Sequence, residues 1–322
     1  MHLHPTLYTK PEKAHTRDGF GEGLMEAARA NLNVLGLGAD TTESTRVAKI
    51  AEVNPKQLVQ MGVAEQNMMG VAAGLATAGK IPFVVTYAVF SPGRAWDQLR
   101  VSVCYSNLNV KVVGAHGGIS VGPDGATHQA LEDIASVRVL PNIVVVVPCD
   151  KEQTKKVTLD AVAHQGPYYF RMGREKTPVI TTPETPFVLG KADVYREGKD
   201  VTIIGCGPLL YEALVAAEQL KGQNIDCEVI NCHTIKPIDV ETLTASARKT
   251  RCVVTVEEHQ ITGGLGGAVA ETLSKNYPVP IEMVGMQDCF GESGSSDELI
   301  EKYGMGVKDV IAAVQKVIKR KK

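Results

Sequence analysis

The chain of 322 residues is 44% hydrophobic and 22% charged, and its formal net charge is −2. This composition is that of an ordinary globular protein, long enough for two domains that each have their own core. The near-neutral charge excludes a strongly basic nucleic-acid-binding surface, and apolar runs such as residues 143–147 are far too short to cross a membrane.

Strand-like apolar runs alternate with helical patterns from about residue 18 onward. The first half contains runs expected to form buried strands at residues 34–37, 83–87, 110–113 and 143–147. A helical pattern covers residues 65–78 and ends at a glycine, as helices often do. Continuous apolar strands separated by helices predict an α/β fold with a mostly parallel sheet flanked by helices.

A break in this alternation falls at residues 177–186, where three prolines are expected to mark a linker. After it the expected strands and helices resume, at residues 201–204, 209–221, 227–230, 239–248 and 252–256. The second unit is therefore predicted to be a separate, smaller α/β domain.

The seven cysteines are scattered and contain no CxxC pair. An odd, unpatterned set favours a reducing compartment over disulfides or a zinc site. The first twenty residues also lack the apolar segment typical of a secretory signal. We therefore expect a cytoplasmic protein whose own residues hold no metal.

The segment at residues 116–129, HGGISVGPDGATHQ, carries the strongest functional signal. It follows an expected strand and combines His116, Asp124 and His128 with four glycines and a proline. A glycine-rich loop after a strand is where α/β folds place ligand-facing polar groups. Because histidine titrates near neutral pH, this combination predicts a site that exchanges protons with hydroxyl groups.

Glu65 begins the expected helix among small and apolar neighbours. A buried carboxylate there could share a proton with a heterocyclic nitrogen, whereas a surface glutamate would only stabilise the helix dipole. Tyr87 and Phe90 follow an expected buried strand, where they could form a stacking wall for a flat ligand or simply pack in the core.

Arg17 and Arg174 stand at the two ends of the first expected domain. A planar guanidinium suits phosphate because it can bind two oxygens, although arginines also form ordinary salt bridges. Ser44 could bind the same anion or cap a turn. The glycine-rich residues 263–267 miss the dinucleotide-binding spacing and are expected to allow close packing of a helix on a sheet. His259 is expected to be a hydrogen-bonded loop histidine.

Together these residues resemble the second half of transketolases. Residues 62–66, GVAEQ, are similar to the family's glutamate motif, and residues 122–129, GPDGATHQ, are similar to its substrate loop. Residues 234–239 and 256–266 resemble signatures of its C-terminal domain. Pro123 and Tyr87 depart from residues common in relatives, which carry an acidic side chain and a phenylalanine there.

The resemblance implies two domains with mostly parallel sheets flanked by helices. These would be a thiamine-diphosphate-binding pyrimidine domain over residues 14–181 and a transketolase C-terminal domain over residues 187–322. The implied reaction moves a two-carbon ketol unit from a ketose phosphate, such as xylulose 5-phosphate, to an aldose phosphate, such as ribose 5-phosphate. Thiamine diphosphate would serve as the electron sink.

The resemblance also assigns roles to matching residues. Glu65 would bind the aminopyrimidine ring nitrogen and favour the imino tautomer, with Tyr87 and Phe90 stacked around the ring. His116 and His128 would handle the protons of sugar hydroxyls.

Other matching residues would contact cofactor or substrate. Asp40 would lie near the cofactor, and Asp124 would hydrogen-bond a sugar hydroxyl. The substrate phosphate would be held by Ser44, Arg17 and Arg174, with Arg171 as the alternative to Arg174.

One departure from the family concerns the diphosphate. Transketolases hold it and its metal through a Gly-Asp-Gly motif in an N-terminal domain, and this sequence has no such motif. The chain also starts where the pyrimidine domain starts. The resemblance thus implies one subunit of a split transketolase, with Mg²⁺ or a similar ion held by an N-terminal partner subunit in an α2β2 heterotetramer. No nucleic-acid or membrane partner is expected.

Three alternatives stay open. A 1-deoxyxylulose-5-phosphate synthase shares the Asp-Gly-x-Thr-His loop, but its loop does not open with the Ala-His-Gly-Gly found at residues 115–118. The beta subunit of a 2-oxoacid dehydrogenase is also a separate chain, but it lacks the Gly-Pro-Asp-Gly-Ala-Thr-His pattern. A regulatory or assembly subunit would keep the fold without turnover, and the joint presence of Glu65, His116, Asp124 and His128 speaks against it.

Overall fold

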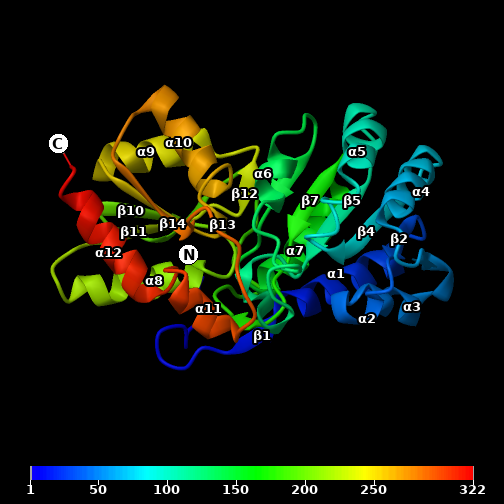
Figure 1. Cartoon of the computed structure of the whole chain (residues 1–322), viewed down its shortest axis with the longest axis horizontal. Helices are drawn as coiled ribbons and strands as arrows, with labels where there is room; N and C mark the ends of the chain where they lie inside the picture. The colour runs from blue at the N-terminus through cyan, green and yellow to red at the C-terminus, as the bar shows by residue number, and fades with distance from the viewer. Residues whose placement is uncertain (1, 322) are drawn as a thin grey trace.

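The apolar runs of the first half build six strands of a seven-stranded sheet in the computed structural model, which describes residues 2–321 (Figure 1). Its order is β12-β6-β7-β5-β4-β2-β3. In chain order the strands are β2 (Val34–Gly38), β3 (Leu58–Gln60), β4 (Ile81–Tyr87), β5 (Lys111–Ala115), β6 (Val144–Val146), β7 (Tyr168–Arg171) and β12 (Thr234–Lys236). All pair in parallel except β12, which runs antiparallel to β6.

Helices cover both faces of this sheet, as the apolar strands predicted. One face packs against α1 (Thr16–Ala30) and α7 (Lys151–Ala163), which bury Phe20 and Val157. The other face packs against α4 (Glu65–Thr77), a π-helical segment at Leu99–Tyr105, and α6 (Asp133–Arg138). Short helices α2 (Thr42–Thr45), α3 (Ile50–Val53) and α5 (Trp96–Gln98) lie in the connections.

The second half forms a five-stranded sheet in the order β14-β13-β10-β11-β9. Its strands are β9 (Asp193–Arg196), β10 (Val201–Gly205), β11 (Cys227–Asn231), β13 (Val253–Gln260) and β14 (Ile281–Met286). Only β9 is antiparallel. Figure 1 shows the helix pair α9 (Val240–Thr250) and α10 (Leu265–Asn276) on one side of the sheet and α8 (Leu210–Lys221) and α12 (Val307–Ile318) on the other. The helix α11 (Ser296–Lys302) precedes α12.

The junction between the halves differs from the expected free linker. The start of the proline-rich segment forms β8 (Lys176–Pro178), which pairs with β1 (Lys13–His15) at the start of the chain. Beyond it, the backbone N–H groups of Ile180 and Thr181 donate to the carboxylate of Asp150, at 2.7 and 2.5 Å. Buried backbone donors need partners, so this segment is fixed to the first half.

The second half is also less separate than the sequence indicated. Its β12 covers the edge of the first sheet beside β6, which would otherwise present unpaired backbone groups. One apolar core contains Val147 of the first half together with Ile204 and Cys232 of the second. The domain boundaries at 14–181 and 187–322 stay a prediction.

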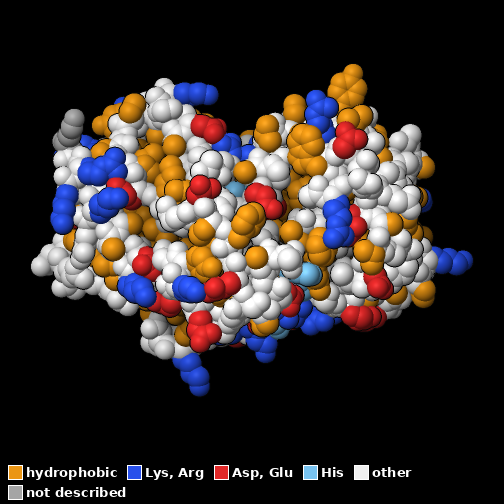
Figure 2. All heavy atoms as spheres, viewed as in Figure 1, with side chains coloured by type: hydrophobic (Ala, Val, Ile, Leu, Met, Phe, Trp, Pro, Cys, Tyr) orange, Lys and Arg blue, Asp and Glu red, His pale blue; other side chains and the backbone are white. Residues whose placement is uncertain are grey.

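The surface agrees with the composition. Acidic and basic side chains are interspersed over the face seen in Figure 2. Among residues 2–321, no helix combines the length and apolarity needed to span a bilayer.

A close contact in the centre of the first sheet provides a test of its packing. A Cβ atom on Gly114 of β5 would lie 2.3 Å from the hydroxyl of Tyr169, which donates to Asp133. We expect Gly114→Ala to lower the free energy of unfolding by about 1–3 kcal/mol in urea titrations. Gly74→Ala, in open space on α4, is the control and should raise it by about 0.5–1 kcal/mol. Equal unfolding midpoints for the two variants would contradict this packing.

Candidate active site

The candidate site residues lie along one edge of the first sheet. In parallel strands the carboxyl ends share an edge, and in α/β folds ligands bind there. Six parallel strands end at this edge, and five of them lead to candidate residues, in the spatial order β7, β5, β4, β2 and β3. The candidate residues at or after these ends are, in the same order, Arg174, His116, Tyr87, Asp40 and Glu65. Arg17 joins them from the first turn of α1.

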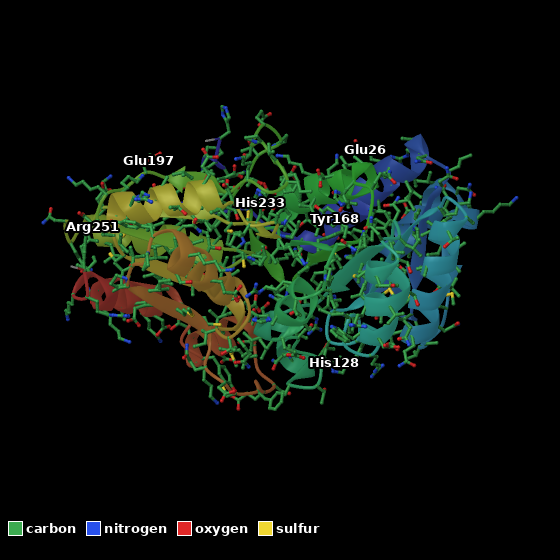
Figure 3. All side chains as sticks on the ribbon, turned by 90° about the horizontal axis from the view of Figure 1, so that it is seen from above. Glu26, His128, Tyr168, Glu197, His233 and Arg251 are labelled. Atoms are coloured by element: carbon green, nitrogen blue, oxygen red, sulfur yellow. The ribbon has the colours of Figure 1, made fainter. Side chains whose placement is uncertain are left out.

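Tyr87 is the centre of the aromatic part of the site. Its ring stacks on His116 with centroids 4.3 Å apart and on Phe90 at 5.9 Å. The ring of His128 meets Tyr87 and Phe90 edge-on, at 6.1 and 5.3 Å. The Tyr87 hydroxyl lies 3.1 Å from the Ser44 hydroxyl. In Figure 3, His128 lies on the green segment beside the junction of the two halves. The rings of Tyr87 and Phe90 therefore pack together with both histidines, and their stacking on a flat ligand stays a prediction.

His116 is buried beside two cations. Its ring accepts a hydrogen bond from Nη1 of Arg17 at Nε2, over 3.4 Å, so the proton of the neutral ring is on Nδ1. Burial, together with the charges of Arg17 and Arg174, lowers the pKa of His116 from 6.5 to about 3. The expectation of a histidine titrating near neutral pH is therefore not met. His116 is a neutral group whose Nδ1–H has no partner among residues 2–321.

Arg174, rather than the alternative Arg171, lies at the substrate-loop motif. Its Nη1 donates to the backbone oxygen of Val121 at 2.5 Å and lies 3.3 Å from the carboxylate of Asp124. His15, which the sequence analysis did not single out, contacts the backbone oxygen of Arg174 at 2.9 Å. The sequence places His15 two residues before Arg17, but no pattern indicated this role.

Arg171 is buried, and its guanidinium contacts other groups of the chain. Only 5% of it is exposed, and its Nε lies 3.1 Å from the carboxylate of Asp133. Its other nitrogens donate to the backbone oxygens of Ala130 and Glu258, at 2.7 and 2.9 Å. All three guanidinium nitrogens thus face groups of the chain itself, as those of a buried arginine must.

Glu65 lies at the first turn of α4, and only 5% of it is exposed. It borders a hollow of about 470 Å³ that is also lined by Val63 and Asn67. Arg94 closes one side, since its Nη1 donates to the Glu65 carboxylate over 3.0 Å and its guanidinium lies 4.2 Å from the Phe90 ring centroid. The expected burial is observed, but its cationic partner was missed because 29 residues separate the pair.

Asp40 is the most isolated of the expected site residues. It is exposed directly after β2, with a φ of +60°, and its side chain makes no hydrogen bond within residues 2–321. The neighbouring Thr41 connects this turn to the site, because its backbone oxygen accepts the Ser44 hydroxyl at 3.0 Å. A contact from Asp40 to a cofactor remains a prediction.

The glycine-rich segment at residues 263–267 binds an anion of its own chain. The backbone N–H groups of Leu265 and Gly266 each donate to the Glu257 carboxylate at 2.7 Å. A Cβ atom on Gly264 would lie 2.0 Å from that carboxylate, which agrees with the expected close packing. His259 lies in β13 rather than in a loop, and its Nε2 accepts the N–H of Ala135 at 3.3 Å.

The family models agree with this two-part architecture. The model "Transketolase, pyrimidine binding domain" matches residues 12–179, and "Transketolase, C-terminal domain" matches residues 190–310. The chain belongs to the transketolase family.

Relatives of this transketolase chain include subunits of similar length. It is 43% identical to the 6-deoxy-6-sulfo-D-fructose transketolase subunit SqwH of Clostridium sp. (strain MSTE9), over 97% of each chain. It is 38% identical to one subunit of the apulose-4-phosphate transketolase of Phocaeicola vulgatus, over 94% of this chain and 97% of that protein.

Two solved structures share the fold. One is titled "Split gene transketolase, inactive beta4 tetramer", with 47% identity, a TM-score of 0.90 and coverage of 96% of this chain and 99% of that chain. The transketolase of Campylobacter jejuni is 23% identical with a TM-score of 0.80, and this chain covers half of it.

The lowered pKa of His116 predicts a pH-dependent stability. Below about pH 6.5 the unfolded chain binds a proton at this position that the folded chain does not bind until about pH 3. The stability contribution is therefore complete above pH 6.5 and is lost as the pH falls toward 3. At about pH 5 the loss should be about 2 kcal/mol. Between about pH 7.5 and pH 5, urea unfolding should show a loss of stability that is about 2 kcal/mol larger in the wild type than in His116→Asn.

The Glu65–Arg94 pair predicts a second stability effect. Arg94→Ala leaves a buried carboxylate without its donor, but about half of Arg94 is in solvent, so we expect a loss of only about 1–2 kcal/mol in the free energy of unfolding. Arg100→Ala, an exposed arginine with no ion pair among the described residues, is the matched control. The contact would be energetically unimportant if both variants unfolded at the wild-type urea concentration.

Proposed function

We propose that this chain is the C-terminal subunit of a two-chain, thiamine-diphosphate-dependent transketolase. The proposal rests on one observation, the buried Glu65 carboxylate beside a hollow and an aromatic wall, at the sheet edge that also carries His116, Asp124 and His128. The family membership favours this reaction over the synthase, dehydrogenase and regulatory alternatives.

The donor set fits the aminopyrimidine part of the cofactor. Glu65 would hold the ring nitrogen, and Tyr87 and Phe90 would pack against the ring, with Asp40 nearby. Arg94 covers both Glu65 and Phe90, so it must rotate away, and its half-exposed side chain leaves it free to do so. When bound, thiamine diphosphate would supply an electron sink for the ketol fragment.

The other residues suit a sugar carrying an anionic group. The free Nδ1–H of the neutral His116 can donate to a hydroxyl, while His128 and Asp124 offer further hydrogen-bonding groups. Arg17 and Arg174 place positive charge at the same corner, where Ser44 can add a hydroxyl. We propose a ketose phosphate such as xylulose 5-phosphate as donor and an aldose phosphate such as ribose 5-phosphate as acceptor, which would connect the enzyme to the pentose phosphate pathway.

The assembly we propose is an α2β2 heterotetramer. The sequence has no Gly-Asp-Gly motif, so an N-terminal subunit would hold the diphosphate and Mg²⁺ or a similar ion. The inactive beta4 tetramer of the similar split-gene protein supports a need for a second chain. A cytoplasmic location is part of the proposal, supported by six cysteines that lie buried as free thiols.

Reconstitution tests this function. Mixed with a subunit that carries Gly-Asp-Gly, thiamine diphosphate and Mg²⁺, the chain should transfer ketol units from xylulose 5-phosphate to ribose 5-phosphate, and neither chain should do so alone. Glu65→Gln should lower kcat about 100-fold or more, because the amide cannot exchange a proton with the ring nitrogen. Glu52→Gln, an exposed glutamate on α3, should leave kcat unchanged.

The donor tested decides between related activities. Turnover of 6-deoxy-6-sulfofructose or apulose 4-phosphate in place of xylulose 5-phosphate would support the proposed ketol transfer but contradict the proposed donor sugar. Turnover of pyruvate instead would favour the synthase or dehydrogenase alternative. Full activity of the Glu65→Gln pair would overturn the proposed role of this carboxylate.

A further inference from the structure

The segment at residues 116–131, called here the substrate loop, is held between the two halves of the molecule. Gln260 of the second half donates its backbone N–H to Leu131 at 2.9 Å. Gln129 donates from its side chain to the backbone oxygens of Ile119 within the loop and Glu292 of the second half, at 3.2 and 2.9 Å. The C-terminal domain therefore contacts the far end of the loop directly.

A buried carboxylate of the C-terminal domain contacts the first part of the loop. Glu258 lies on β13 of the C-terminal domain, only 5% of it is exposed, and its Oε1 accepts the backbone N–H of Ser120 at 2.5 Å. A Cβ atom on Gly118 would lie 2.2 Å from the same oxygen, and Gly118 has a φ of +94°. The loop therefore needs glycine there, both for its left-handed backbone and to approach this carboxylate.

Packing holds only part of this segment, since Ile119 and Val121 are fully buried but one side borders open space. A cavity of about 810 Å³ borders it at Ser120 and Pro123, and the walls on the other side include Glu258 and the start of α11 at Ser296. Ser120 and Pro123 therefore have fewer packing partners on the side that faces the cavity. On this side the loop is held by the hydrogen bond from Ser120 to Glu258, in addition to the one from Arg174 to Val121.

The backbone of Glu258 also takes part in contacts with the loop. Arg171 donates to the backbone oxygens of Glu258 and of Ala130, and it pairs with Asp133. The buried Arg171 thus connects the strand that carries Glu258 to the end of the loop. Two arginine hydrogen bonds, the Glu258 carboxylate and the backbone bond from Gln260 to Leu131 fix the loop relative to β13.

We propose that Glu258 is a positioning residue for the reaction, through which the C-terminal domain sets the place of His116 and Asp124. The Ser120 hydrogen bond lies between these two residues in the loop, so its loss would displace the sugar-binding groups. A small misplacement of such groups is enough to weaken the binding of the sugar in its reactive position. This inference rests on the proposed ketol transfer and gives the C-terminal domain a part in it, without any contact of Glu258 with substrate.

The neighbouring residue Glu257 is a matched control. It is also buried on β13, burial raises the pKa of both carboxyls, and it also accepts backbone N–H groups. Its partners, Leu265 and Gly266, lie inside the C-terminal domain at the start of α10, because successive side chains of a strand point to opposite sides. Loss of either carboxylate leaves buried N–H groups unpaired, but only Glu258 contacts the loop.

The kinetic test compares Glu258→Ala, Glu258→Gln and Glu257→Ala in the reconstituted two-chain enzyme. Glu258→Ala should raise the KM of the sugar phosphates by about tenfold or more with a smaller change in kcat. Glu258→Gln should recover much of this loss, because its amide oxygen can still accept the Ser120 N–H. Glu257→Ala should lower the thermal midpoint at least as much as Glu258→Ala and keep KM near the wild-type value. Equal KM changes in Glu258→Ala and Glu257→Ala would overturn the proposal.

Hydrogen exchange of the separate subunit tests the inference without enzyme activity. The amides of residues 118–125 should exchange about tenfold faster in Glu258→Ala, while Glu257→Ala should affect only residues 265–270. If the wild-type pair showed no ketol transfer, the proposed function would fail, and this measurement would still show whether Glu258 holds the loop. Unchanged amide exchange at residues 118–125 in Glu258→Ala would overturn the proposed positioning role of Glu258.

Discussion

The parallel pairing of the first sheet is the constraint on which the site depends. Parallel strands must all end at one edge, so the residues that follow five separate strands meet there although they are far apart in sequence. The order of the strands then fixes the order of the functional side chains along this edge. The carboxylate of Glu65 lies at one end and the guanidinium of Arg174 at the other. Tyr87 joins the two parts through its contacts with Phe90 and His116.

The electrostatics of the site follow from burial next to fixed cations. Arg17 and Arg174 lie beside a histidine with almost no access to water, and a third positive charge there would be strongly disfavoured. His116 is therefore a neutral hydrogen-bonding group, and the same cations remain available to an anionic substrate. At the Glu65 end of the site, Arg94 offsets the negative charge of the buried carboxylate.

The two halves act as one structure rather than as two linked units. An antiparallel strand, a shared apolar core and buried polar contacts cross the junction, and the contacts concentrate around the substrate loop. A buried hydrogen-bonded group is costly to leave unpaired, so each of these contacts resists relative movement of the halves. The C-terminal domain thereby acts as the support for a loop that belongs to the other domain.

The sequence by itself determined the α/β class, many of the strands and helices, and the position of the glycine-rich loop after β5, because apolar periodicity and glycine-rich motifs are local properties of the chain. Only the tertiary structure decided which distant groups meet. Arg94 covers Glu65, β12 joins the first sheet, and Glu258 reaches Ser120. The neutral state of His116 likewise depends on burial and neighbouring charge, which no linear pattern encodes. Contacts between residues far apart in sequence are set by packing, and that is a property of the whole fold.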